Sequence, residues 1–147
     1  MSRIAATGLL TLALVAGIAV PAIPCLADRL PRLVATGSAF GSLICHQRPD
    51  RSFTSCSRTW PVCGRCSGLY LGAACGAVLV GLGLRRRQTV REWRRALLIA
   101  AVPTVLSWTL EAVTGLDPGT VARFVLALPL GLLTALWLGA VARGDLR

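Results

Sequence analysis

The chain has 147 residues, of which 54% are hydrophobic and 15% are charged. Water-soluble domains are about 45–50% apolar and about 25% charged, so this composition excludes an ordinary soluble domain and also a disordered chain. The net charge of +10 comes from arginine, because the chain contains no lysine. Long apolar runs separate the arginines and no nucleic-acid motif is present, so we expect no nucleic-acid partner. Basic loops beside membrane helices explain the charge better, and we expect the lipid bilayer as the main partner.

Four apolar runs are long enough to cross a bilayer at about 1.5 Å per residue. They predict spans at approximately residues 4–26, 66–84, 96–116 and 123–142 of a single integral membrane domain, residues 1–147. The predicted fold class is therefore all-α, a polytopic transmembrane bundle of about four spans in the cell membrane. A Cys/His-rich loop, residues 28–65, is expected at one membrane face.

The first run begins after Arg3 and resembles a signal peptide. It is longer than a usual signal core, which favours a retained helix over a cleaved leader. Pro21 and Pro24 should end or kink this helix. Residues 33–44 are mildly apolar but too short to cross, and they predict a helix along the membrane surface.

Arginines indicate the orientation of the spans. The loop after the second span carries six of them within a dozen residues: Arg85, Arg86, Arg87, Arg91, Arg94 and Arg95. Basic residues this close to helix ends favour the cytoplasmic side. The N-terminus would then be cytoplasmic, and the Cys/His-rich loop would face outward.

A stripe of glycines, Gly64, Gly68, Gly72 and Gly76, runs along the second span with a spacing of four residues. In membranes, small residues at this spacing allow close helix approach. We therefore expect close packing against a neighbouring span, either of this chain or of another copy.

The densest chemistry lies in Cys45, His46, Cys63 and Cys66, which are three thiols and the single imidazole of the chain within 22 residues. Thiolates and imidazole suit a tetrahedral zinc ion, so zinc is the predicted cofactor. Because neighbouring side chains point apart, Cys45 and His46 can share one ion only through an unusual turn. Otherwise one of them is a ligand and the other has a different task.

The same spacing also permits thiol–disulfide exchange. A C-x-x-C pair that starts a helix, with Arg65 between the thiols, favours the thiolate. A plain disulfide or inert thiols are further alternatives. Cys56 can pair or join the site, whereas Cys25 and Cys75 lie in apolar runs and are expected to be inert.

Glu111 lies inside the third span, where a carboxylate is costly and usually has a partner. Arg123 is the expected partner, because the turn signalled by Asp117-Pro118-Gly119 joins the two spans. In any four-span arrangement, this turn and the Cys/His-rich loop share one face. Glu111 and Arg123 are therefore the candidate catalytic residues. The carboxylate is a candidate general base or metal ligand.

Arg48, Arg51, Arg58 and Arg65 lie on the same face. Their arginine side chains would hold a phosphate or carboxylate group, or contact lipid headgroups.

The motifs Cys45-His46-Gln47, Arg51-Ser52-Phe53 and Pro61-Val62-Cys63-Gly64-Arg65-Cys66 continue to Gly68, Tyr70 and Gly72. They resemble the signature of the family of small prokaryotic membrane proteins called domain of unknown function 2085. The resemblance implies several membrane helices and a shared Cys/His site, but no established activity. It places Glu111 at an acidic position where Glu111-Ala112 stands instead of Asp-Gly.

Three functions remain open on the sequence. The first is a metal-dependent membrane enzyme that acts on a lipid-borne or amphipathic substrate, or on an anionic small molecule. The second is a membrane thiol–disulfide redox protein. The third is a non-enzymatic transport or assembly subunit with a structural metal.

Overall fold

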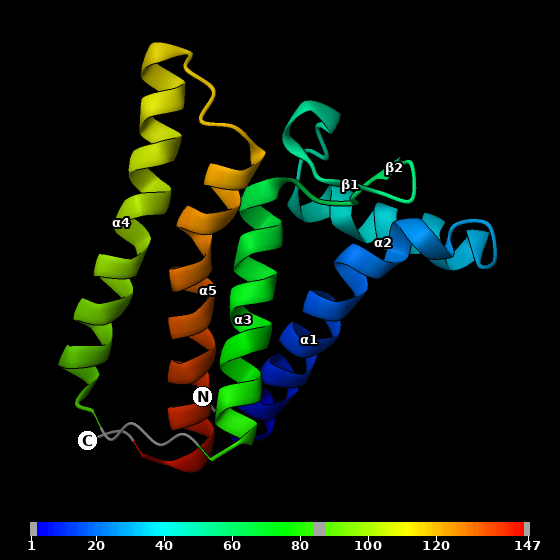
Figure 1. The fold of residues 1–147 in the computed structure, drawn as a ribbon. Coiled ribbons are helices and arrows are strands. Elements are labelled where there is room, and N and C mark those ends of the chain that lie inside the picture. Colours follow the sequence, from blue (N-terminus) through cyan, green and yellow to red (C-terminus); the bar gives the residue numbers. More distant parts are fainter. Residues whose placement is uncertain (1–2, 84–87, 146–147) are drawn as a thin grey trace.

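Four helices of the computed structural model, which describes residues 3–83 and 88–145, are long and apolar enough to cross a membrane. They are α1 (Arg3–Ala22), α3 (Gly64–Gly81), α4 (Val90–Thr114) and α5 (Thr120–Arg143). The predicted all-α bundle of about four spans is therefore confirmed (Figure 1). Of the predicted cytoplasmic arginines, Arg85, Arg86 and Arg87 lie outside the described residues.

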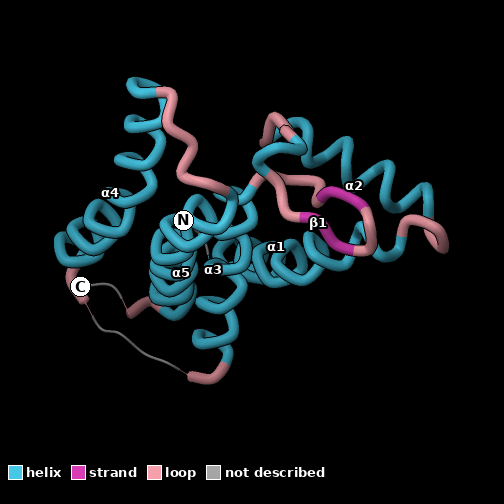
Figure 2. Tube along the Cα trace, turned by 45° about the horizontal axis from the view of Figure 1, so that its top comes forward, coloured by secondary structure: helices cyan, strands magenta, loops and turns pink. Residues whose placement is uncertain are grey.

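The two ends of the bundle differ. One end carries the segment between α1 and α3: η1 (Ile23–Leu26), α2 (Pro31–Ile44), η2 (Pro49–Arg51), and a short antiparallel hairpin of β1 (Thr54–Ser55) and β2 (Arg58–Thr59). We call it the loop end. Residues 33–44 do form a helix, and α2 runs across the direction of α3 and α5 (Figures 1 and 2). The first helix ends at Ala22 and continues as a 3-10 turn, as its prolines predict.

The centre of the bundle is the pair α3 and α5, which makes the most extensive interface between elements. Both helices begin at the loop end, so they run parallel (Figure 1). The predicted glycine stripe lies in this interface. A Cβ at Gly64 or Gly76 would lie 2.6 Å from the carbonyl oxygen of Thr120 or Leu132, and Gly68 and Gly72 face α5 backbone in the same way. The expected close packing is thus confirmed, and the neighbour belongs to the same chain.

The two outer helices are attached differently. α1 packs on both α3 and α5. Gly17 of α1 allows this approach, because a Cβ there would lie 3.1 Å from the carbonyl oxygen of Tyr70. α4 packs chiefly on α5 and remains largely exposed. Its helix begins at Val90, before the predicted apolar span, because Thr89 and Glu92 form a capping box at its start.

Candidate thiol and arginine site

Three free thiols converge at the loop end. Cys45 follows the last residue of α2, Cys63 precedes the first residue of α3, and Cys66 lies in the first turn of α3. Their sulfur atoms all lie within 4.8 Å of one another. Cys45 is buried, and its sulfur accepts a hydrogen bond from the backbone N–H of Cys63 at 3.2 Å. We refer to these three residues as the thiol cluster.

A clamp built by Gln47 brings the two parts of the thiol cluster together. The side-chain amide of Gln47 donates hydrogen bonds to the carbonyl oxygens of Ser38, at 2.6 Å, and Pro61, at 2.7 Å. A Cβ at Gly41 would lie 2.6 Å from this amide and from the Pro61 oxygen, so the approach of α2 requires glycine. Gln47 itself has a φ of 48°, in the left-handed region. Its place in the Cys-His-Gln motif thus has a structural reason that the sequence analysis did not find.

The environment of Cys63 favours its thiolate. The hydrogen bond from the Cys66 thiol is the main cause that lowers the pKa of Cys63 to about 5, against the opposing effect of burial. The backbone N–H groups of Cys66 and Arg65, at the start of α3, act in the same direction. Because the thiolate is both the metal ligand and the nucleophile, the thiol cluster is suited to either chemistry.

His46 occupies a different position. Its side chain is exposed, it borders the pocket beside the thiol cluster, and it is not among the residues whose ligand atoms converge there. The backbone thus directs Cys45 inward and leaves His46 at the rim of the pocket. His46 as a metal ligand remains a prediction.

Glu111 is surrounded by three arginines from three parts of the chain. Its Oε1 pairs with Arg51, at 2.6 Å, and with Arg123, at 2.9 Å; its Oε2 pairs with Arg65, at 2.7 Å. The expected contact between Glu111 and Arg123 is confirmed. The sequence placed Arg51 and Arg65 on this face but did not identify them as partners of Glu111. We call Arg51, Arg65 and Arg123 the arginine cluster.

Several nitrogen atoms of the arginine cluster have no hydrogen-bond partner among the described residues. Only 1% of the Arg123 side chain is exposed. Its Nη2 also pairs with Asp117 at 2.9 Å, whereas its Nε and Nη1 have no hydrogen-bond partner among the described residues. The Nε atom of Arg65 also lacks a hydrogen-bond partner there, and the Nε atom of Arg51 has only an ion pair with Asp50 at 3.6 Å. Buried donors without partners are costly, so this cluster has unused capacity for an acceptor.

A pocket of about 470 Å³ joins the two clusters. It is lined by all three residues of the thiol cluster and all three of the arginine cluster, together with His46 and with Thr104 and Trp108 of α4. The loop is held over α5 by Phe53, whose ring lies edge-on to Phe124 at a centroid distance of 5.4 Å. The phenylalanine of the Arg-Ser-Phe motif therefore anchors the segment that carries Arg51.

The remaining cysteines correct one expectation. Cys25 was expected to be inert, but it forms a disulfide with Cys56. The reason is that the helix ends before Cys25, so the 3-10 turn η1 carries this residue to the hairpin. Cys75 is free and exposed on α3. Arg58 pairs with Asp28 rather than with Glu111.

The fold and the site define a class: a multi-pass helical membrane protein with a cluster of thiols and arginines at one face. The chain belongs to the family described as "Predicted membrane protein (DUF2085)", whose model matches residues 45–137, as the resemblance of its motifs predicted. The matched region contains the thiol cluster, Glu111 and Arg123.

Two archaeal relatives have been found. An uncharacterized protein of Methanothermobacter thermautotrophicus is 33% identical over 89 residues, which cover 60% of this chain and 78% of that protein. An uncharacterized protein of Methanocaldococcus jannaschii is 31% identical over 86 residues, covering 57% of this chain and 54% of that protein. No solved structure matches the chain.

Proposed function

We propose that the thiol cluster holds a zinc ion, with His46 or a substrate atom as the fourth ligand. The observation that carries this proposal is the convergence of three free thiols within 4.8 Å. Tetrahedral zinc with bonds of about 2.3 Å to sulfur needs sulfurs about 3.8 Å apart. A contraction of about 1 Å at most would therefore meet zinc geometry.

The proposed activity is that of a metal-dependent enzyme acting on a lipid-borne or amphipathic substrate. A zinc ion with three protein ligands and an accessible fourth position supplies a Lewis acid or an activated water. The shared pocket supports this reading, because it puts the arginine cluster beside the thiol cluster. Arg123 would bind an anionic group of the substrate, because two of its buried nitrogens have no other partner in the described chain.

For Glu111 we propose a positioning role rather than that of a general base. Both of its oxygens are engaged by guanidinium groups at 2.6 to 2.9 Å. A carboxylate held in this way fixes the arginines and is poorly placed to accept a proton from a substrate.

Metal content tests the zinc proposal. We expect about one zinc ion per chain in protein purified in detergent, measured by elemental mass spectrometry. Cys63→Ser should lose the zinc, whereas Cys75→Ser should keep it, because Cys75 is a free cysteine outside the thiol cluster. Wild-type protein without bound metal would overturn the proposal.

A second candidate, thiol–disulfide exchange, is favoured by the closeness of the Cys63 and Cys66 sulfur atoms, within 4.8 Å, together with the lowered pKa of Cys63. In this reaction the Cys63 thiolate attacks a partner disulfide and releases one partner thiolate. The Cys66 thiol then loses its proton to the released partner thiolate, attacks the Cys63 sulfur of the mixed disulfide and releases the second partner sulfur as a thiolate. The partner disulfide is thus reduced by two electrons, and Cys63 and Cys66 become a disulfide.

Alkylation distinguishes the two candidates. A redox pair should change between two free thiols and one disulfide when metal-free protein is exposed to reductant or oxidant. The change is read as a mass shift after alkylation in a background with Cys25→Ser, Cys56→Ser and Cys75→Ser, so that the Cys25–Cys56 disulfide does not contribute. Thiols that stay in one state under both conditions would exclude exchange.

A further inference from the structure

The pocket between the two clusters has a neighbour toward the middle of the bundle. A second pocket, of about 270 Å³, lies between α1, α3 and α5. The side chain of Leu69 lines both pockets. On α3, Arg65, Leu69 and Ala73 follow one another at intervals of one helical turn, about 12 Å in all. Arg65 lines the first pocket, and Ala73 lines the second. The two pockets are therefore neighbours along α3, and we call them together the α3 groove.

The two ends of the α3 groove have opposite chemistry. Its outer part carries the arginine cluster and the thiol cluster. Its inner part is lined almost entirely by apolar side chains, among them Leu9 and Leu12 of α1 and Leu138 of α5. The hydroxyl of Thr134 in that part is already used, because it donates to the carbonyl oxygen of Leu130 at 2.7 Å. A ligand that fits both ends has a charged head and an apolar chain.

The charge of the head follows from the arginines that line the outer part. Arg123 is fully buried, lines the outer part, and has two nitrogens without a partner among the described residues. The N-termini of α3 and α5 lie at the same end of the bundle (Figure 1), and helix N-termini also favour anions. An oxyanion such as a phosphate or carboxylate group satisfies guanidinium donors of this kind.

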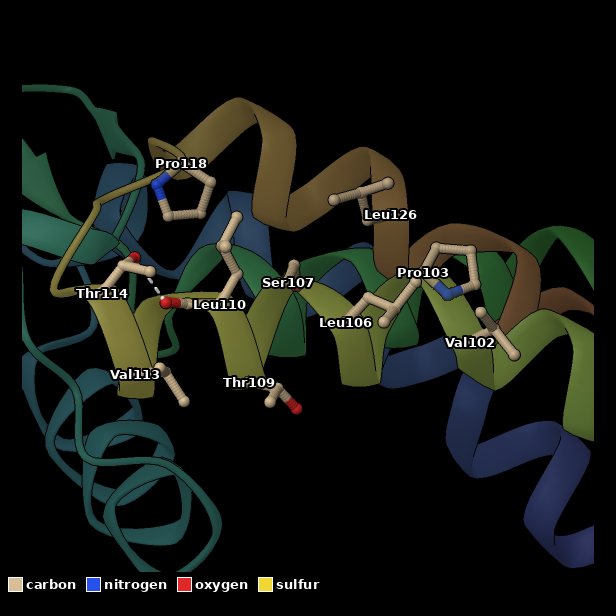
Figure 3. Close-up of a pocket in the computed structure, with 10 residues that line it drawn as sticks. All are labelled: Val102, Pro103, Leu106, Ser107, Thr109, Leu110, Val113, Thr114, Pro118 and Leu126. Carbon is tan, nitrogen blue, oxygen red and sulfur yellow. Dashed lines mark hydrogen bonds between the residues drawn. The ribbon is translucent and has the colours of Figure 1, made fainter.

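Another recess is larger than either pocket of the α3 groove, but its lining does not suit an anionic head. It has a volume of about 760 Å³ and lies between α4 and α5, with Leu106, Leu110 and Val113 along α4 (Figure 3). None of the described residues that line it is charged. Thr104 and Trp108 of α4, by contrast, line the outer part of the α3 groove. At helical spacing these two positions lie on a different face of α4 from Leu106 and Leu110.

We propose that the α3 groove binds one membrane amphiphile, with its oxyanion head at the arginine cluster and its chain along α3 past Leu69. The occupant is a lipid rather than a free anion, because the apolar inner part adjoins the head site at Leu69. This inference rests on the proposed function, because it names the class of substrate that the proposed enzyme would act on. The binding itself requires no metal.

Dodecyl phosphate is a suitable probe, and native mass spectrometry of the whole chain, released from a neutral detergent, counts the bound molecules. We expect one dodecyl phosphate per chain. Inorganic phosphate lacks the apolar chain and dodecanol lacks the anionic head. Each of them should therefore bind at least about tenfold more weakly than dodecyl phosphate. Arg51→Gln should weaken dodecyl phosphate at least about tenfold. This variant is preferred because Arg51 lies in the loop and is partly exposed.

A matched pair of variants locates the chain of the ligand. Leu69→Trp should block the α3 groove and weaken dodecyl phosphate at least tenfold, whereas Leu106→Trp, in the recess of Figure 3, should not. The melting temperature of each variant shows that it is folded. Equal effects of the two tryptophans would overturn the proposal, as would binding of inorganic phosphate or dodecanol as tight as that of dodecyl phosphate. Absence of dodecyl phosphate binding would overturn it as well.

Zinc content measured on the same samples separates the two proposals. Dodecyl phosphate bound to zinc-free protein would support the α3 groove and refute the metal centre. Bound zinc without dodecyl phosphate binding would support the metal centre and refute the α3 groove.

Discussion

Glu111 is a single carboxylate that holds three guanidinium groups together in a largely buried place, with 11% of its side chain exposed. Glu111→Gln removes the negative charge between the three guanidinium groups of the arginine cluster, which then repel one another. Breaking a buried ion pair on one side costs on the order of 3 kcal/mol. We therefore expect a clear fall in the melting temperature of the detergent-solubilised protein.

Glu92→Gln is the matched control for this change. Glu92 is exposed and takes part in the capping box of α4, which glutamine can also form, so this variant should melt close to the wild-type temperature. If Glu111→Gln melted no lower than Glu92→Gln, the positioning role of Glu111 would be wrong.

Part of the site could be predicted from single residues and part could not. Spacing identified Cys63 and Cys66, and the cost of a charge inside a span identified Glu111. The pairing of Cys25 with Cys56 was missed, because it depends on where a helix ends and a hairpin returns. The clamp of Gln47 was missed for the same reason, since its partners lie 9 and 14 residues away.

At the scale of elements, the packing of α3 on α5 depends on the absence of side chains along the glycine stripe. A Cβ at Gly72 would overlap the backbone of Leu128. Gly72→Ala should therefore lower stability, by about 1–3 kcal/mol if the helices have to separate. Thermal unfolding followed by circular dichroism in detergent measures this loss.

Gly81→Ala is the control on the same helix. A Cβ at Gly81 meets nothing within 4 Å, and alanine is the better helix former. This variant should be as stable as the wild type or slightly more stable. Equal destabilisation by the two alanines would show that the stripe does not set the distance between α3 and α5.

The elements themselves could be predicted well from hydropathy, because a bilayer requires long apolar helices. Their ends could not, because helix ends depend on caps. α4 extends toward its N-terminus as far as Val90 through its capping box, and α3 already begins at Gly64. The parallel pairing of α3 with α5 also could not be predicted, since the glycine spacing is compatible with a partner in another chain.

For the whole molecule, the disulfide and the arginines make the same prediction of sidedness. Disulfides persist in oxidising compartments, and Cys25–Cys56 lies at the loop end. We expect this end to face outward. In Cys25→Ser the freed thiol of Cys56 should react with a membrane-impermeant maleimide added to intact cells, giving one label more than the wild type.

Gln88→Cys supplies the control at the other end of the bundle, in the connection between α3 and α4. Its added thiol should react only after the membrane has been disrupted. Labelling of Gln88→Cys in intact cells, together with no additional label on Cys25→Ser, would reverse the orientation.

The parallel pairing of α3 with α5 also determines when the site is completed during synthesis. The disulfide and the thiol cluster use residues that all precede the second turn of α3. Glu111 and Arg123 are synthesised later, and α5 can reach α3 only after α4 has brought the chain back to the loop end. A nascent chain thus exposes its three thiols and two of its arginines before their carboxylate arrives. The fourth span therefore completes the site, and a chain truncated before α5 would carry the cysteine motifs without Arg123 in the pocket that they line.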